Sequence, residues 1–398
     1  MRQARARGRP EFGPSQRPSV ENEQELIRQS AREFAAREIE PYAREWDRSE
    51  AMDRGIVAKL ADAGYLGAAL PEAYGGLGLD TVSYCVLCEE LGRGDSSVRG
   101  IVSVNVGLVG KTIVQWGTEE QRRDWLPPLC SGEGLGCYAL TEPGSGSDPA
   151  SLATRAERDG DSWILSGSKL FITLGTWASL ALVFARTGGE GPRGITCFAV
   201  PTDSPGFEAR PIKGKLGLRA QDTGELFLDG VRVPDANRLG AVGEGFKVAM
   251  SALDTGRISL GAGCVGIGLG CLDACIGYAR ERRQFGRAIA GFQLVQELIA
   301  DIAVETEAAR LLVRRAAALA DAGEPHTLES SYAKYFASEA SVRAANAAVQ
   351  VHGGYGYVDE YPVGKYLRDA RVTTLYEGTS QIQKLIIGRA LTGESAFA

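Results

Sequence analysis

Apolar residues recur at helical spacing through the first part of the chain. Leu26, Phe34 and Ile39 belong to one apolar face, with charged residues between them. This spacing is typical of an amphipathic helix that packs against a core. The pattern predicts a helical N-terminal domain over residues 21–135, and we expect residues 1–20 to form a disordered tail.

The middle of the chain changes to short runs of β-branched and aromatic residues. Segments such as SWILSG, SLALVFART and GITCFAVP are separated by Gly, Asp and Pro at the spacing of strands and turns. No ten-residue helical pattern lies between them, which argues against a βαβ arrangement. We therefore expect an antiparallel β-barrel or sandwich over residues 136–242.

Helical periodicity returns in an alanine-rich C-terminal region. Residues 291–323 and 327–354 each form a long amphipathic pattern, and Gly353 with Gly354 ends the second one. The sequence therefore predicts a helical bundle over residues 243–398. The expected fold is mostly α, with a central β domain between two helical domains.

Composition narrows the functional classes. The chain has 398 residues, 44% of them hydrophobic, which is ample for a large core. Lys and Arg number 44 against 50 Asp and Glu, and the formal charge of −6 argues against a dedicated nucleic-acid binder. The most apolar long stretch, residues 258–279, is rich in Gly and broken by Asp273, so we expect no membrane span. Its letters GAGCVG match a dinucleotide-binding pattern, but no strand precedes them, so close helix packing explains them better.

Cysteine and histidine usage excludes several kinds of site. Eight cysteines in a chain of this length do not indicate a disulfide scaffold, and the single CxxC, Cys85 to Cys88, has no second pair at zinc spacing. Two histidines, His326 and His352, are too few for a His-rich metal site or a Ser-His-Asp triad. We expect no metal and a reduced, cytoplasmic compartment. The Arg-rich start of the chain would instead indicate the mitochondrial matrix if it is a transit-peptide remnant.

A lone acidic residue stands before the last predicted helix. Glu377 lies between Tyr376 and Gly378, and an amphipathic pattern follows a Thr379-Ser380 pair that is suited to cap a helix. No cationic residue adjoins Glu377 in the sequence. A carboxyl buried beside an aromatic ring has a raised pKa and is a stronger base. The alternative is a glutamate that only caps the helix.

Two further stretches carry candidate binding chemistry. The loop YALTEPGSGSDPAS, residues 138–151, offers backbone N–H groups and hydroxyls to an anion or a flat heterocycle. An ordinary turn-rich connection explains that loop equally well. The basic turn RERRQFGRAIAGFQ, residues 280–293, could bind a phosphate through Arg282 or Arg283. A solvated charge cluster is the alternative there.

Taken together, these stretches resemble the acyl-CoA dehydrogenase family over nearly the whole chain after about residue 22. The resemblance rests on LTEPGSGSD, LSGSKLFIT, ERRQFGRAIAGFQLVQ, QVHGGYGY and LYEGTSQIQKLIIGRA, in that order. It implies an FAD enzyme with a C-terminal four-helix bundle, commonly a homotetramer (or a homodimer), that desaturates acyl thioesters between the α and β carbons. Electrons would pass to an electron-transfer flavoprotein.

The resemblance also assigns roles to single residues. Glu377 matches the catalytic base, whose backbone N–H, with a flavin ribityl hydroxyl, binds the thioester oxygen while hydride passes from the β carbon to flavin N5. The positions implied to contact FAD are Thr141, Ser147, Phe171, Thr173, Thr379, Gln381, then Arg282, Phe285 and Gln293 reaching from a neighbouring subunit, and Gln350, Gly353 and Gly354 at the adenosine end. The positions implied to line the acyl-CoA channel are Arg99, Ser147, Asp254, Arg257, Tyr376 and Gly378.

Arg99, in GDSSVRGIVSVN, bears on the substrate. Short-chain members of the family usually have a small residue here, whereas glutaryl-CoA dehydrogenases and relatives that act on carboxylated, carrier-bound acyl groups have an Arg in this context. The resemblance implies that Arg99 binds a substrate carboxylate at the blind end of the acyl pocket. The alternative is a structural ion pair with Glu89, Glu90 or Asp95. The chain also departs from the glutaryl branch at EGTSQIQ.

Three hypotheses of the activity follow. The first is FAD-dependent dehydrogenation of an acyl-CoA, with glutaryl-CoA as a candidate, or of a similar acyl group on an acyl carrier protein. The second is an oxidase of the same fold that passes electrons to O2. The third is a catalytically silent scaffold, against which the presence of Glu377, Thr173 and Arg282 argues.

Overall fold

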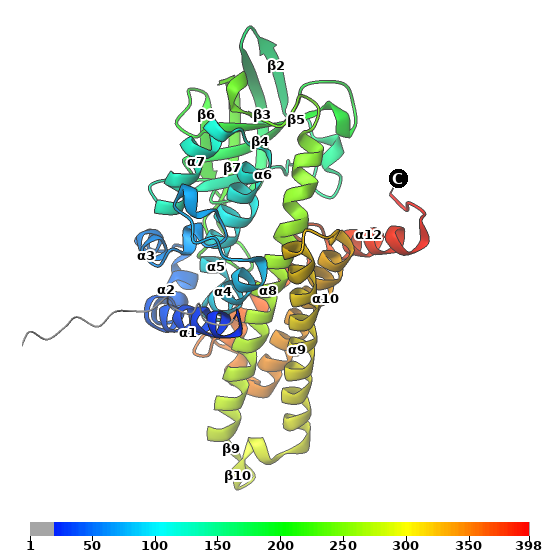
Figure 1. The fold of residues 1–398 in the computed structure, drawn as a ribbon. Helices are drawn as coiled ribbons and strands as arrows, with labels where there is room; N and C mark the ends of the chain where they lie inside the picture. The colour runs from blue at the N-terminus through cyan, green and yellow to red at the C-terminus, as the bar shows by residue number, and fades with distance from the viewer. Residues whose placement is uncertain (1–19, 398) are drawn as a thin grey trace, which may run out of the picture.

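The structure, a computed structural model, describes residues 20–397 and has helices at both ends of the chain and a β-sheet in its middle (Figure 1). This arrangement confirms the expected mostly helical fold with a central β domain. The first helical region contains α1 (Val20–Glu38), α2 (Glu40–Ser49), α3 (Ile56–Asp62), α4 (Thr81–Gly94), α5 (Ser96–Val102), a π-helix (Ser103–Gly110), α6 (Lys111–Trp116) and α7 (Glu119–Ser131).

Side-chain caps fix the start of two helices in this region. Asp80 accepts a hydrogen bond from the N–H of Ser83 and begins α4, and Asp95 accepts from the N–H groups of Ser97 and Val98 and begins α5. Such caps satisfy N–H groups that have no partner within the helix. The cap at Asp95 therefore defines where α5, the helix that carries Arg99, begins.

One eight-stranded sheet follows the first helices. Its strands are β1 (Gly136–Ala139), β2 (Arg155–Asp159), β3 (Ser162–Thr173), β4 (Leu180–Arg186), β5 (Ile195–Pro201), β6 (Phe207–Pro211), β7 (Thr223–Pro234) and β8 (Arg238–Leu239). They pair in the order β6-β7-β3-β2-β4-β5-β8, with β1 added on β4. The long β3–β7 pair contains register shifts between Leu165 and Gly167 and between Lys169 and Ile172.

The expectation of a purely antiparallel sheet is wrong in two places. β1 pairs with β4 in parallel over four residues, and β2 meets β4 in parallel at Arg155 and Arg186. The remaining pairs of this sheet are antiparallel. β2 and β3 lie between β1 and β4 in the chain, and this long connection lets the chain return in the same direction without a crossover helix.

The second helical region forms the long lower part of the molecule in Figure 1. It contains α8 (Gly245–Glu281), a short hairpin of β9 (Arg283–Gln284) and β10 (Arg287–Ala288), α9 (Gln293–Asp321), α10 (Thr327–His352), α11 (Val363–Thr373) and α12 (Ser380–Thr392). α8 packs against α4, α9 and α10 and is the central helix of the fold.

Glycines on α8 allow this packing. A Cβ at Gly266 would lie 2.2 Å from the carbonyl oxygen of Glu89 on α4, and a Cβ at Gly92 would lie 2.8 Å from the carbonyl oxygen of Gly263. The two backbones approach too closely for any side chain at these positions. Close helix contact therefore accounts for the GAGCVG stretch.

Two helical stretches have the length and hydropathy of a membrane span. They are Ser96–Trp116 and Gly245–Glu281, and 89% and 67% of their most apolar windows are buried inside the fold. Core helices of globular proteins have the same properties. Both stretches here supply the core contacts that surround the site.

Candidate active site

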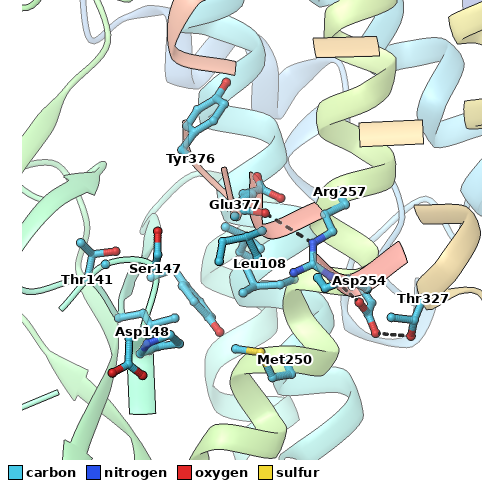
Figure 2. Close-up of a pocket in the computed structure, with 18 of the residues that line it drawn as sticks. Leu108, Thr141, Ser147, Asp148, Met250, Asp254, Arg257, Thr327, Tyr376 and Glu377 are labelled. Carbon is cyan, nitrogen blue, oxygen red and sulfur yellow. Dashed lines mark hydrogen bonds and ion pairs between the residues drawn. The ribbon is translucent and has the colours of Figure 1, made fainter. Parts of the chain in front are cut away.

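A large cavity opens where the β-sheet meets the helices (Figure 2). Its volume is about 1260 Å³, which exceeds the range that a single drug-sized ligand usually occupies. The walls come from α5, the loop after β1, the end of β3, the first half of α8, and the segment that leads into α12. The cavity brings together these predicted site residues: Arg99, Thr141, Ser147, Phe171, Thr173, Asp254, Arg257, Tyr376, Glu377 and Gly378.

Glu377 places its carboxylate in this cavity in an unusual setting. The Oε2 atom is buried, and within residues 20–397 it has no hydrogen-bond partner. A Cβ at Gly256 on α8 would lie 2.5 Å from this oxygen, so the helix leaves room for the carboxylate by having no side chain there. An unpaired buried carboxylate is costly to maintain, which is typical of a group retained for its chemistry.

The charge environment of Glu377 differs from what the sequence suggests. Burial raises the pKa of the Glu377 carboxyl, and the positive charges of Arg99, Lys334 and Arg257 oppose that rise. The sequence shows no cation beside Glu377, but the fold brings these three from α5, α10 and α8. Glu377 therefore sits in a buried site with a compensating positive field.

The backbone around Glu377 is held in a left-handed turn. The φ angles of Glu377 and Gly378 are 53° and 85°, and the first is a strained value for a residue with a side chain. Gln383 Nε2 donates to the carbonyl oxygens of both residues at 3.1 Å, and Arg257 Nε donates to that of Glu377 at 3.4 Å. Lys334 Nζ donates to the Gly378 carbonyl at 2.7 Å. Four hydrogen bonds thus converge on two successive carbonyls.

Thr379, and not Glu377, caps α12. Its hydroxyl accepts a hydrogen bond from the N–H of Ile382 at 3.2 Å. The hypothesis that Glu377 only caps the helix is therefore wrong. The N–H of Glu377 itself donates no hydrogen bond in the described part of the chain, so it remains available to a ligand.

Arg99 lines the cavity and is buried, with 3% of its surface exposed. Its Nη1 donates to the Ser103 hydroxyl at 3.0 Å and its Nη2 donates to the Tyr376 hydroxyl at 2.9 Å. The Nε atom has no partner in residues 20–397, and a Cβ at Gly263 would lie 2.7 Å from it. Arg99 is a buried cation whose hydrogen-bond partners are neutral hydroxyls.

The hypothesis of a structural ion pair for Arg99 is wrong. The three carboxylates proposed for it are taken by other cations: Glu89 pairs with Arg310 at 3.1 Å, Glu90 with Arg28 at 3.2 Å, and Asp95 with Lys365 at 2.6 Å. A buried guanidinium without a carboxylate is expensive unless a ligand supplies one.

The side of the cavity formed by the β domain presents a loop and an exposed ring. The glycines Gly144 and Gly146 have open space where a side chain would be, and Gly146 lines the cavity. Phe171 has a φ of 59° and is 65% exposed. Thr173 accepts a hydrogen bond from Gln221 at 3.1 Å. Open backbone, an exposed aromatic ring and hydroxyls are suited to a flat heterocycle, so these residues fit a flavin.

An ion pair marks the opposite wall. Asp254 accepts hydrogen bonds from Arg257 Nη1 at 2.8 Å and from the Thr327 hydroxyl at 2.7 Å (Figure 2). The pair links α8 to the first residue of α10. It leaves Arg257 Nε free to reach the Glu377 carbonyl, so the channel wall and the backbone of the carboxylate residue share one side chain.

The structure does not bring all predicted FAD contacts into the cavity. Arg282, Phe285, Gln293, Gln350, Gly353 and Gly354 lie around the β9–β10 hairpin and the end of α10, at the end of the long helices away from the β-sheet (Figure 1). Arg282 lies 5.4 Å from the centre of the Tyr355 ring, and Phe285 is 94% exposed. Thr379 and Gln381 are close to the cavity but do not line it. One chain alone therefore does not unite these positions, because the length of α8 separates the two groups.

Sequence reasoning missed several residues that shape the site. Lys334 and Gln383 hold the backbone at Glu377, Ser103 binds Arg99, and Gly256 makes room for the carboxylate. A signal was present for Lys334, because a lysine at the position of a core residue lies among Ala and Ser on α10. The others carry no local signal, since their partners are far away in the sequence.

Comparison with known proteins agrees with the geometry. Models of the acyl-CoA dehydrogenase N-terminal, middle and C-terminal domains match residues 21–133, 137–231 and 243–392. The chain is 44% identical over 375 residues to an acyl-CoA dehydrogenase of Bacillus subtilis, covering 94% of this chain and 99% of that protein. It is 40% identical to the glutaryl-CoA dehydrogenase structure from Mycobacterium smegmatis (TM-score 0.90, 96% and 97% covered), and 37% identical to that of butyryl-CoA dehydrogenase from Megasphaera elsdenii (TM-score 0.91, 96% and 100% covered).

Proposed function

The chain belongs to the acyl-CoA dehydrogenase family, an FAD-dependent enzyme family, and on this premise we propose that Glu377 is the base that removes the α proton of an acyl thioester. The observation that carries the proposal is the buried, unpaired Glu377 Oε2 in the large cavity. When bound, FAD supplies the acceptor for the hydride that leaves the β carbon.

The surroundings of Glu377 suit proton abstraction. A desolvated carboxylate is a stronger base than one in water, because burial disfavours its charged form. The charges of Arg99, Lys334 and Arg257 limit this effect and keep the group ionised before it takes a proton. Negative charge then develops on the thioester oxygen, and the free N–H of Glu377 is the donor that we assign to it.

The two groups of predicted FAD residues support a shared cofactor site. Thr141, Ser147, Phe171 and Thr173 would hold the ring system from within the cavity. The group near the β9–β10 hairpin, at the far end of α8, would hold the FAD of a neighbouring subunit. This division supports a homotetramer or homodimer, and the electron acceptor that we propose is an electron-transfer flavoprotein. We place the enzyme in the cytoplasm, without a membrane span.

Arg99 supports a substrate with a second carboxylate. A guanidinium binds a carboxylate through two parallel hydrogen bonds, and the direct hydrogen-bond partners of Arg99 within residues 20–397 are neutral hydroxyls. We propose an acyl thioester of the glutaryl type, carried by CoA or by an acyl carrier protein. An oxidase would form peroxide in air without an added acceptor, and a silent scaffold would purify without a flavin band.

The test of the base is Glu377→Gln. The amide has the shape of the carboxylate but cannot take the proton, so we expect FAD and thioester binding to persist while turnover falls by about 100-fold or more. Anaerobic bleaching of the flavin band by glutaryl-CoA measures this loss. Glu208→Gln is the control, because Glu208 is an exposed carboxylate that pairs with Arg210 and does not line the cavity. Undiminished bleaching in Glu377→Gln would assign the base to another residue.

A further inference from the structure

Lys334 is a buried lysine that the reaction scheme above uses only as a background charge. It lies on α10 with 0% of its surface exposed, and within residues 20–397 it forms no ion pair within salt-bridge distance. Its hydrogen-bond acceptor is the carbonyl oxygen of Gly378, at 2.7 Å. Burying an ammonium group against a neutral carbonyl costs stability, and the fold would save that cost with an apolar residue.

The acceptor of Lys334 is one residue from the base. Gly378 and Glu377 form the left-handed turn, with φ angles of 85° and 53°. Gln383 binds both carbonyls from α12 and Arg257 binds that of Glu377 from α8, so three elements close on one turn. Without these donors the strained conformation of Glu377 would relax, and its carboxylate would leave the space opposite Gly256.

We propose that Lys334 is a positioning residue for the base: its ammonium holds the Gly378 carbonyl, and so the turn that aims Glu377, while its charge keeps the Glu377 carboxylate ionised in a buried site. The proposal rests on the assignment of Glu377 as the base.

The charged and titratable groups around this pair are few. Arg99, Lys334 and Arg257 act on Glu377 as cations, and the charge of Glu377 acts on the phenols of Tyr376 and Tyr138. Lys334 itself faces Cys264, Glu377, Arg257 and Glu339, and burial lowers its pKa to about 8. Lys334 is thus charged at neutral pH, and it can lose its proton in a range where exposed lysines keep theirs.

The experiment compares Lys334→Met with the wild-type holoenzyme. Methionine keeps the length of the side chain and removes both the charge and the donor. We expect the pH at which Glu377 ionises, followed as the carboxyl band that Glu377→Gln abolishes in infrared difference spectra, to rise by about one unit. We expect kcat with glutaryl-CoA to fall about tenfold or more, and Tm not to fall, because the buried ammonium is gone.

Two further variants separate the parts of the proposal. Gln383→Leu keeps the charge and removes the other donor of the turn, so kcat should fall while the ionisation of Glu377 stays in place. Lys334→Gln keeps a donor without the charge, and the ionisation should move as in Lys334→Met. Lys384→Met, at an exposed lysine on α12 next to the Tyr335 ring, is the matched control and should change neither quantity.

The outcomes distinguish this proposal from the one on which it rests. Wild-type ionisation of Glu377 together with wild-type kcat in Lys334→Met or Lys334→Gln would overturn the role of Lys334. A Tm that falls in parallel with kcat, at unchanged Glu377 ionisation, would also overturn it in favour of a merely structural lysine. Full turnover in Glu377→Gln would instead overturn the base assignment, while the infrared titration would still report whether Lys334 acts on Glu377.

Discussion

At the scale of single residues, two side chains carry the proposed chemistry: Arg99 is buried and Glu377 is half-buried with its Oε2 atom fully buried, and within residues 20–397 neither forms an ion pair. Glu377 has an unpaired oxygen, and Arg99 is bound by the hydroxyls of Ser103 and Tyr376. Tyr376 precedes Glu377 directly, so the residue whose hydroxyl binds Arg99 is covalently joined to the proposed base. Burying a charge without a partner lowers the stability of the fold. We therefore infer that both side chains face a ligand.

Replacing Arg99 tests the carboxylate specificity. Arg99→Ala should lower kcat/KM with glutaryl-CoA by about 100-fold, since a buried charge-assisted contact contributes roughly 3 kcal/mol. The rate with butyryl-CoA should change much less, because that acyl chain has no second carboxylate. The ratio of the two kcat/KM values is the measurement. An unchanged ratio would mean that Arg99 serves the fold and not the substrate.

At the scale of secondary-structure elements, α8 decides where the site residues can sit. Its glycines have two different roles: some admit a neighbouring backbone, as Gly266 does for α4, and some admit a charged side chain, as Gly256 does for Glu377. Glycine on α8 thus permits close helix packing in one turn and leaves space for a side chain of the candidate site in another. This explains why the glycine-rich stretch could be recognised as a close contact, while the space that Gly256 leaves for Glu377 could not be predicted.

Two alanine substitutions on α8 separate these roles. In Gly256→Ala the new Cβ would lie 2.5 Å from Glu377 Oε2 and 2.8 Å from Leu108 Cδ2, so the carboxylate must move. We expect turnover to fall at least tenfold while the protein remains folded. Gly277→Ala on the same helix meets no atom within 4 Å and should stabilise the helix by about 1 kcal/mol.

Steady-state rates and thermal unfolding of the two variants provide the comparison. Equal rates in Gly256→Ala and the wild type would show that the Glu377 carboxylate is free to choose another position. Gly277→Ala is the control for any general effect of an added alanine on α8 on the rate or on thermal unfolding.

At the scale of the whole molecule, the predicted cofactor residues fall into two groups separated by the length of α8. The outer face of α9 runs between them and exposes Val304 and Leu311, seven residues apart and 69% and 60% exposed. Apolar side chains repeated at this spacing share one face of a helix, and such a patch is typical of a subunit interface.

Charging this face tests whether the cofactor site is shared. The double variant Val304→Glu and Leu311→Glu should yield a smaller particle by sedimentation and should lose most of its flavin absorbance per subunit, because in the proposed shared site Arg282 and Phe285 would no longer reach a neighbouring FAD. Leu26→Glu on α1, at a residue that is 58% exposed, is the control for adding a charge. A monomer that keeps its full flavin content would contradict the shared site.

The sequence predicted the fold class, because helical periodicity and strand spacing are local properties, and it narrowed the cap of α12 to the Thr379-Ser380 pair, of which Thr379 is the cap. It could not predict what surrounds the candidate site residues. Lys334 and Glu377 are 43 residues apart, 377 − 334, and the hydrogen bond between Arg99 and Tyr376 spans 277 residues. The parallel pairing of β1 with β4 was missed for the same reason, because the two strands are far apart in the sequence. Contacts of this range depend on packing: a lysine among the small residues of α10 marks Lys334 as unusual, but no single position shows which distant partner it meets.

On the proposed roles of Glu377 and Arg99, the two glycines of α8 that face these side chains would also set the length of the acyl chain. Gly256 lies against Glu377 and Gly263 against Arg99, and seven residues of helix correspond to about 10 Å along one face. Contacts of about 3 Å at each end leave roughly 4–5 Å, or about four covalent bonds, between the reacting carbon and a carboxylate oxygen. A five-carbon dicarboxylic acyl chain has that reach. The spacing along α8 would then select the substrate by its length. A shorter diacid could not contact Glu377 and Arg99 at once, and a longer one would have to fold between them.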